Sequence, residues 1–324
     1  MDLTIEEIAP ILENYDLGSP LSLSRLRSGF ANENYHLITD VGEALFRVCR
    51  EKSKEEIQYE LRVLQRLKKE AFPAAYPIQR RNGSFISRLK ENVIVASEMK
   101  SVKEGNDCVL LMDFIAGGEP KQNPETVREI ARATARLNSI EVNSDLRRAN
   151  ALGPDLCHEI MMKLDAGDHT FSYPEIFNYF REETERLIEP LSKELPTGLI
   201  HGDIFPDNTI FQGDRLKAIV DFEEVCTDSL LVDVGVTING FCFPDDRLDE
   251  NLLDIFLKTY QEIRPLSSLE WKLLPYYIEW GAHAMIAWHL KYLLDEQDSR
   301  KMGRLQFFMK RVKELRKKDV RFHD

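Results

Sequence analysis

The first third of the chain alternates apolar and polar side chains in short runs, with the period of a β-strand. Residues 21–50 predict a strand, a loop, a second strand, a turn near Asp40–Gly42 and a third strand at about 44–49. Residues 54–69 place isoleucine and leucine at helical spacing instead, which predicts a helix. This part of the chain is therefore expected to be a small sheet accompanied by at least one helix.

Two more apolar runs, at 92–99 and 108–115, predict further strands before three small residues, Ala116-Gly117-Gly118, end the pattern. The remaining chain is mainly helical in period. The expected helices are 125–140, 175–191, 250–263 and two long segments near the C-terminus.

Two apolar segments interrupt these helices, at 197–203 and 208–222, and they flank a polar loop. Gly213-Asp214 is typical of the turn of a β-hairpin within the second segment. The fold class expected is α+β. It has a sheet-rich N-terminal lobe at 1–115, and a mainly helical C-terminal lobe at 116–324 that contains an embedded hairpin.

Composition excludes some classes of protein. Of the 324 residues, 43% are hydrophobic and 30% charged, as in a globular protein. The formal charge of −12 argues against binding along nucleic acid, which requires a basic surface. It leaves room for an ATP site, where backbone donors, one cation and metal ions can offset the phosphate charge locally.

The cysteines and the chain start predict a cytoplasmic protein without a membrane partner. The acidic N-terminal sequence lacks the basic and apolar regions of a signal peptide, and no apolar stretch is long enough to cross a bilayer. The cysteines form no CxxC pair and are odd in number, which favours scattered reduced thiols: Cys49, Cys108, Cys157, Cys226 and Cys242.

The polar loop and its flanking strands carry the strongest chemical signal, in LIHGDIFPDNTIFQGDRLKAIVDFEEV. Phosphoryl transfer needs a carboxylate near the attacking hydroxyl and oxygen ligands for Mg²⁺. Asp203 is the predicted catalytic base, while Asn208 and Asp221 are predicted catalytic residues that hold Mg²⁺. His201 is expected to brace the loop. The alternative is a solvated acidic loop without function.

A cation in an apolar strand supplies a second signal. Arg47 interrupts ALFRVC, and burying it without an anionic partner would be costly. Glu60 lies on the apolar side of the next predicted helix, so we expect the two to pair and to orient nucleotide phosphates. The alternative is a surface arginine with Glu55, Glu56 and Glu60 as interchangeable acids.

Two segments are candidates for contacts with the rest of the nucleotide. The loop that contains Ser28 and Gly29 lies between the first two predicted strands, where a phosphate-covering loop is expected, although an ordinary hairpin loop fits as well. Asp113 and Ile115 lie at the lobe junction, where backbone groups can pair with the adenine edge.

Taken in order, these segments resemble the aminoglycoside phosphotransferase/choline kinase superfamily, over nearly the whole chain. The matching stretches are SGFANEN, LLMDFIAGG, HGDIFPDN, IVDFEEV and LLVDVGV. CTDSLLVD and INGFCF make the chain most similar to the kinase-fold (type II) homoserine kinases. The resemblance implies a bilobal protein-kinase-like fold, ATP and Mg²⁺ as cofactors, and a structural Asp233 behind the catalytic loop.

The chain departs from the homoserine kinase pattern at Glu223 and Glu224, where aromatic residues are expected, and at Gly240-Phe241. An amino-acid acceptor would need a carboxylate for its ammonium group, and the candidates are Asp207, Glu223, Glu224 and Glu279, beside Asp203 itself. Tyr276, Trp280 and His283 share a helical face that is more typical of core than of a pocket.

The sequence therefore predicts an ATP-dependent phosphotransferase acting on a hydroxyl of a small metabolite, with L-homoserine as the leading acceptor. An aminoglycoside, choline, ethanolamine or a sugar remain alternative acceptors. A non-catalytic nucleotide-binding regulator is the alternative of another class, and Asp203, Asn208 and Asp221 together argue against it. The basic tail after Arg300 is expected to be a helix docked on the body.

Overall fold

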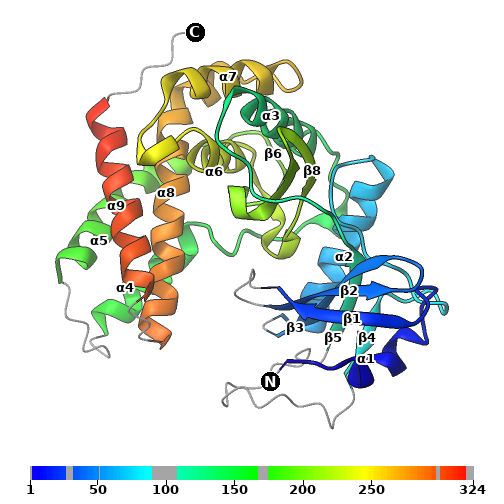
Figure 1. The fold of residues 1–324 in the computed structure, drawn as a ribbon. Helices are drawn as coiled ribbons and strands as arrows, with labels where there is room; N and C mark the ends of the chain where they lie inside the picture. The colour runs from blue at the N-terminus through cyan, green and yellow to red at the C-terminus, as the bar shows by residue number, and fades with distance from the viewer. Residues whose placement is uncertain are drawn as a thin grey trace. The chain divides into compact units, whose positions relative to one another are not determined.

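The computed structural model describes residues 2–26, 32–50, 52–89, 108–166, 174–296 and 300–318. The chain divides into two compact units (Figure 1). The N-terminal unit comprises Met1–Gly117 together with Lys217–Glu223, and the C-terminal unit comprises Gly118–Leu216 together with Glu224–Asp324. The first is rich in sheet and the second is mainly helical, which confirms the predicted fold class.

The N-terminal unit is built on a five-stranded antiparallel sheet in the order β1-β2-β3-β5-β4. Its strands are β1 Pro20–Arg25, β2 Asn32–Thr39, β3 Glu43–Cys49, β4 Ile86–Arg88 and β5 Cys108–Asp113. The first three strands and the turn after Thr39 lie where the alternating pattern predicted them. The predicted strand at 92–99 lies outside the described residues.

A short helix not predicted from the sequence, α1 (Ile5–Leu12), closes one side of this sheet. Ile8 and Leu12 are buried in one apolar cluster with Tyr35, Phe46 and Leu111 of the sheet. A capping box between Thr4 and Glu7 satisfies backbone groups at the start of this helix.

The predicted helix at 54–69 is α2, Lys54–Lys69. Ser53 and Glu56 form its capping box, which explains why it begins there. Ile57, Leu61 and Leu64 are buried, as the helical spacing predicted, and Glu60 is buried among them.

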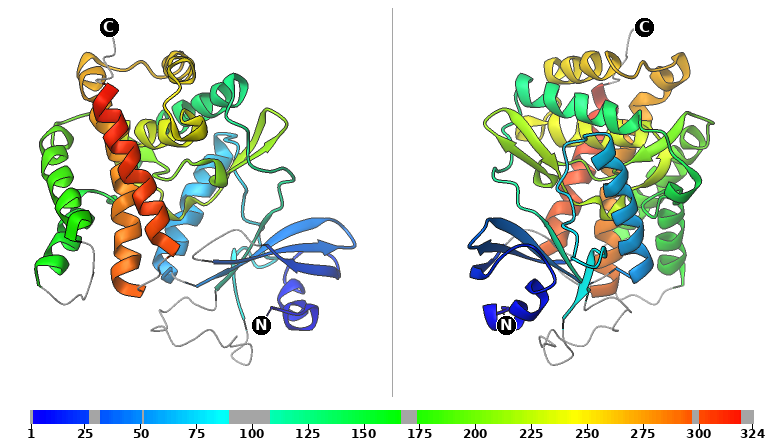
Figure 2. Two further views of the ribbon diagram at one scale, coloured as in Figure 1. Left: turned by 60° about the vertical axis from the view of Figure 1, so that its left-hand side comes forward. Right: turned by 90° about the vertical axis from the view of Figure 1, so that its right-hand side faces the viewer.

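The C-terminal unit contains seven of the described α-helices. They are α3 Pro124–Asn138, α4 Pro154–Asp165, α5 Pro174–Leu191, α6 Leu231–Phe241, α7 Glu250–Gln261, α8 Ser268–Glu296 and α9 Arg300–Lys318. Figure 2 shows α8 and α9 running side by side, with Leu305, Phe308 and Val312 of α9 buried. The C-terminal segment is thus a docked helix, as predicted.

Short strands lie between α5 and α6. They are β6 Thr197–Ile200, β7 Thr209–Gln212, β8 Arg215–Ile219 and β9 Cys226–Ser229. β7 and β8 form the predicted hairpin, and the division between the units falls within β8. β6 pairs with β9, a strand that the sequence pattern did not predict.

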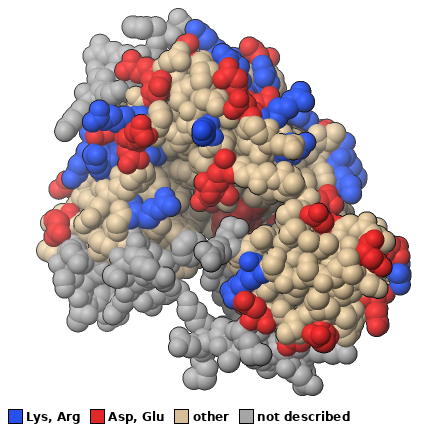
Figure 3. Space-filling view, viewed as in Figure 1, with Lys and Arg blue, Asp and Glu red and all other residues tan. Residues whose placement is uncertain are grey.

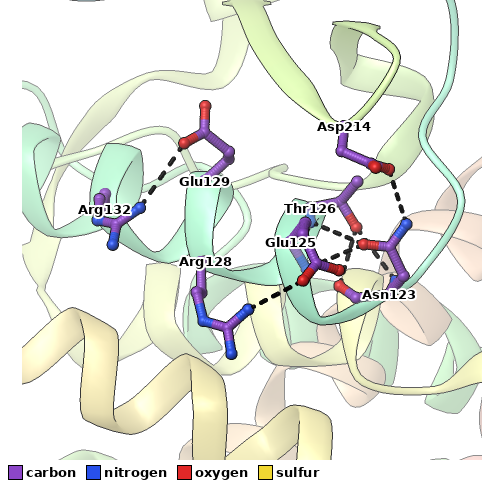
Figure 4. Close-up of polar contacts among 7 residues, drawn as sticks. All are labelled: Asn123, Glu125, Thr126, Arg128, Glu129, Arg132 and Asp214. Atoms are coloured by element: carbon purple, nitrogen blue, oxygen red, sulfur yellow. Dashed lines mark hydrogen bonds and ion pairs between the residues drawn. The ribbon is translucent and has the colours of Figure 1, made fainter.

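Helix α3 begins at an asparagine that also contacts the hairpin turn (Figure 4). The Asn123 side chain accepts hydrogen bonds from the N–H groups of Glu125 and Thr126, and its Nδ2 donates to Asp214 Oδ1 at 2.8 Å. One residue therefore caps the helix and ties it to the β7–β8 turn.

Helices α6 and α8 cross with their backbones in contact. A Cβ atom on Gly235 would lie 2.0 Å from the carbonyl oxygen of Tyr277, and one on Gly281 would lie 2.9 Å from Gly235. Asn239 Nδ2 donates to the Gly235 and Ile278 carbonyls, so it joins the two helices. Only glycine permits so close an approach at both positions.

Acidic and basic side chains are interspersed on the face drawn in Figure 3. Exposed ion pairs such as Arg181–Asp165, at 2.5 Å, join neighbours of opposite sign. None of the helices in the described part of the chain has the length and hydropathy that a bilayer span requires.

A buried histidine of α8 packs against α5. His283 is fully buried, its Nε2 lies 2.8 Å from Thr184 Oγ1, and its ring stacks on Phe180. The neighbouring charges belong to an ion-pair cluster in which Arg186 and Arg316 each contact both carboxylates of the pair Glu183 and Glu279. Burial and the two arginine charges lower the pKa of His283 to about 3.

We expect His283 to make the protein sensitive to mild acid. The folded state holds the ring neutral, whereas the unfolded chain protonates it near pH 6.5. The stabilisation is therefore complete above pH 6.5 and is lost progressively as the pH falls from there toward 3, by about 2 kcal/mol at pH 5. Urea unfolding at pH 7 and pH 5 measures it. His283→Gln should lose most of this difference, while His158→Gln, on exposed α4 surface, should retain it. An equal difference in both variants would assign the acid sensitivity elsewhere.

Candidate active site

The loop after β6 brings Asp203 and Asn208 together. A turn of 3-10 helix at Pro206–Asn208 folds the chain back, and Asn208 Nδ2 donates to Asp203 Oδ2 at 2.7 Å and to the Asp203 carbonyl at 2.9 Å. The spacing of five residues thus brings the two side chains into direct contact, as the motif predicted. The amide also fixes one carboxylate oxygen in position.

A buried carboxylate behind the loop holds its backbone. Asp233, on α6, has no exposed surface and accepts hydrogen bonds from the N–H of His201 at 2.9 Å and of Gly202 at 2.8 Å. Asn138 Nδ2 donates to it at 3.0 Å. Burial raises the pKa of the Asp233 carboxyl, and these donors oppose that rise. Asp233 therefore braces the loop structurally, in line with the resemblance.

Two further features fix the loop's conformation. Gly202 has φ of 81°, a left-handed conformation that favours glycine. His201 is fully buried, and its Nδ1 accepts a hydrogen bond from the Asp203 N–H at 3.3 Å. His201 therefore contacts the loop as a bracing residue would, whereas Asp207, at the outer side of the same loop, is exposed.

Asp221 belongs to the N-terminal unit and follows β8 directly. It is exposed, with φ of 66°, in a left-handed conformation that aspartate adopts more readily than most residues. Its neighbours are anchored, because Ile219 N–H bonds to the Pro73 carbonyl and Phe222 packs edge-on against Phe72. The sequence therefore holds an exposed carboxylate on a fixed stretch of backbone.

The predicted pair of Arg47 and Glu60 forms. Arg47 Nη1 donates to Glu60 Oε1 at 2.8 Å and Nη2 donates to Glu60 Oε2 at 3.0 Å, and both side chains are buried. A third residue joins them, since Arg47 Nη2 also donates to Glu223 Oε1 at 2.6 Å. Glu223 is predicted to contact an acceptor, and in the structure its carboxylate accepts this bond from Arg47.

The charged side chains of this cluster shift one another's pKa values. Burial lowers the pKa of Arg47, but Glu60 and Glu223 outweigh it and hold that pKa above its ordinary value. Burial raises the pKa of the Glu223 carboxyl to about 7, against the opposing charge of Arg47. Arg47 is thus a permanent cation that shares its donors between two carboxylates.

The remaining predicted nucleotide contacts are only partly described. Ser28 and Gly29 lie outside the described residues. Asp113 ends β5 and exchanges hydrogen bonds with Tyr76, since its N–H donates to the Tyr76 carbonyl and its Oδ2 accepts from the Tyr76 N–H. Ile115 lies two residues further along the chain and is half-buried.

Asn138 supports the loop but was not predicted from the sequence. Its Nδ2 donates to Asp233 and to the Leu199 carbonyl, and its Oδ1 accepts from Tyr260 Oη at 2.9 Å. One sequence feature could have indicated it: Asn138 is an amide on the apolar face of a predicted helix, and a buried polar side chain needs hydrogen-bond partners.

A family model described as "Phosphotransferase enzyme family" matches residues 22–266. This chain belongs to that family. As a member of the phosphotransferase enzyme family it is a kinase-type enzyme, which confirms the class predicted from the loop and its metal-ligand pattern.

Curated relatives of this phosphotransferase are named homoserine kinase. The protein from Nitrobacter winogradskyi is 29% identical over 277 residues, which cover 85% of this chain and 80% of the relative. The protein from Caulobacter vibrioides is 30% identical over 278 residues, which cover 85% of this chain and 83% of the relative.

Solved structures of similar fold include other small-molecule kinases. An amicoumacin kinase in complex with AMP-PNP, Ca²⁺ and its ligand has a TM-score of 0.72 at 12% identity, covering 99% of this chain and 96% of that one. A spectinomycin phosphotransferase in complex with ADP and spectinomycin has a TM-score of 0.70 at 11% identity, covering 97% and 98%. These similarities concern the fold.

Proposed function

We propose that this phosphotransferase is a homoserine kinase, which transfers the γ-phosphoryl group of ATP to the hydroxyl of L-homoserine and forms O-phospho-L-homoserine and ADP. The observation that carries this proposal is the 28–30% identity to curated homoserine kinases over 83–85% of the chain. The loop geometry supports it, since it presents a carboxylate fixed for hydroxyl chemistry.

Asp203 would act on the acceptor. Asn208 holds its Oδ2, and the carboxylate so oriented would accept the hydroxyl hydrogen bond. The hydroxyl oxygen then attacks the γ-phosphorus in line, the bond to the β-phosphate oxygen breaks, and the hydroxyl proton passes to Asp203.

Mg²⁺ fits the residues predicted to bind it. Because Asn208 donates both its amide hydrogen bonds to Asp203, its Oδ1 faces away from that partner and is an oxygen ligand of the kind Mg²⁺ prefers. Asp221 supplies an exposed carboxylate on fixed backbone. We propose these two residues as the protein ligands. Bound there, the ion would neutralise charge on the phosphates during transfer.

The N-terminal unit would hold the nucleotide. Arg47, oriented by its two-point bond to Glu60, is proposed to contact the phosphates, as the strand cation does in protein kinases. Asp113 and Ile115 are proposed to offer backbone groups to adenine, and Ser28 and Gly29 to cover the phosphates. On the acceptor side, exposed Asp207 is proposed to bind the ammonium group, while Glu223 is engaged by Arg47.

ADP release with Mg-ATP and a panel of acceptors tests the function. We expect turnover with L-homoserine, and a kcat/KM at least about tenfold lower for L-serine, because a shorter acceptor places its hydroxyl out of reach of the γ-phosphate. The panel also contains L-threonine, choline, ethanolamine and aminoglycosides, which represent the other acceptors considered. Turnover with one of these and none with homoserine would retain the phosphotransferase and reject this acceptor.

A further inference from the structure

A buried arginine of the C-terminal unit has a side-chain donor without an acceptor among the described residues. Arg311, on α9, is 6% exposed, and its Nη1 donates to the carbonyl of Asn239 at 2.7 Å. Its Nε is buried and finds no hydrogen-bond partner among the described residues. Its Nη2 lies 3.6 Å from Asp246 Oδ1, beyond hydrogen-bond distance, and that carboxylate is half exposed.

Aromatic rings surround this guanidinium. Its central carbon lies 4.4 Å from the ring centre of Phe243, 4.7 Å from that of Phe307 and 5.6 Å from that of Phe308. Rings stabilise the positive charge through their faces but accept no N–H hydrogen bond in the guanidinium plane. Burial lowers the pKa of Arg311 to about 10, so the group is still charged at neutral pH. A buried cation is normally paired with an anion at hydrogen-bond distance, whereas Asp246 lies 3.6 Å from Nη2 and the buried Nε has no acceptor among the described residues.

Arg311 lies beside the loop that carries Asp203. It bonds to Asn239, and the next residue, Gly240, is pressed against that loop, since a Cβ there would lie 2.9 Å from the Ile204 carbonyl oxygen and 3.2 Å from Phe205 Cα. Phe205 packs edge-on against Phe308 with ring centres 6.2 Å apart. The Phe205 N–H in turn bonds to the Asp203 carbonyl.

We propose that Arg311 binds the α-carboxylate of the acceptor, with the hydroxyl end of the same molecule at Asp203. The inference rests on the proposed function, because it assumes an acceptor that is a hydroxy amino acid. A carboxylate can accept from Nε and Nη2 together, which is the side-on pairing that arginine favours, and it would give the buried Nε an acceptor. Asp207 would then face the ammonium group, so the two charges of the zwitterion meet opposite charges.

Replacing Arg311 by the neutral residue glutamine tests this pairing. We expect Arg311→Gln to raise the KM for L-homoserine by about 30-fold or more, because it removes a charge-assisted bond to the acceptor. The KM for Mg-ATP should stay within about twofold, since Arg311 bonds to Asn239 and lies near Asp246, and neither residue is proposed to hold the nucleotide or Mg²⁺. Arg311→Lys should recover part of the homoserine affinity, because it keeps the charge and loses the fork.

Competitive inhibitors separate carboxylate binding from damage to the fold. L-2-aminobutyrate keeps the carboxylate and lacks the hydroxyl, so its Ki should rise in Arg311→Gln by about the same factor as the homoserine KM. For 3-aminopropan-1-ol, which is homoserine without the carboxylate, the Ki should be unchanged by the substitution. Arg316→Gln is the matched control. Arg316 lies on the same helix as Arg311 and forms an ion pair with Glu183. Its replacement should leave the homoserine KM within about twofold.

The outcomes separate the two proposals. If the wild-type enzyme does not phosphorylate homoserine, the proposed function fails before any variant is compared. If it does, and Arg311→Gln keeps a homoserine KM within threefold of wild type, only the carboxylate site is overturned. Equal losses for homoserine, 3-aminopropan-1-ol and Mg-ATP, with a lower melting temperature, would reduce Arg311 to a structural tie between α9 and α6.

Discussion

Replacing Asp203 by asparagine is expected to lower kcat by about a thousandfold, with little change in the KM for ATP. Asparagine keeps the shape of the side chain but can neither orient the attacking hydroxyl as an anion nor take up its proton, and loss of such a group usually costs 10²–10⁴-fold. Steady-state ADP release with L-homoserine measures the change.

Asp214→Asn is the matched control for this substitution. Asp214 lies in the turn of the β7–β8 hairpin of the same polypeptide segment, and its carboxylate contacts only the Asn123 side chain among the described residues. That variant should retain kcat within about twofold. A rate for Asp203→Asn within tenfold of wild type would exclude Asp203 as the base, whatever the acceptor.

Replacing Asp233 by alanine is expected to lower the free energy of unfolding by about 3–5 kcal/mol. The substitution leaves the N–H groups of His201 and Gly202 and the amide of Asn138 buried without their acceptor. Because these groups hold the loop that carries Asp203, the protein that remains folded should also lose activity. Urea unfolding followed by circular dichroism gives the free energy.

Asp228→Ala provides the comparison for this large loss. Asp228 lies in β9, is half-buried, and accepts from the Asn150 side chain at 2.8 Å and from the Ser229 N–H at 2.6 Å, so its removal should cost about 1–2 kcal/mol. Similar losses for the two variants would show that Asp233 is no more than an ordinary polar contact.

Local sequence patterns predicted the parts of this fold whose burial is one-sided. Strand β2 alternates in burial, helix α2 carries an apolar stripe, and both patterns follow directly from the geometry of the element. Helix α6 offers no such contrast, because all of its residues are buried. A segment that is covered on every side shows no period, so the sequence could not indicate it by pattern alone.

In the candidate site too, some contacts were predictable from the sequence and others were not. Asp203 and Asn208 are five residues apart in one turn, so their contact was predictable from spacing. Glu223 reaches Arg47 across 176 positions, and nothing in the local pattern of either residue indicates that contact. Arg311 looked like one more basic residue of a polar tail, and only its packing distinguishes it from its exposed neighbour Lys310.

The glycine crossing of α6 and α8 has an evolutionary consequence. Each glycine faces the backbone of the opposite helix, so a larger residue at Gly235 would meet backbone atoms of Tyr277, which no change of side chain on α8 can remove. Both positions are therefore expected to remain glycine during neutral evolution. The register of α6, the helix that carries Asp233, is then expected to stay fixed as well. Descendants of this chain that acquire new acceptors are expected to do so by exchanging side chains on α9 and the loops, around a crossing that does not change.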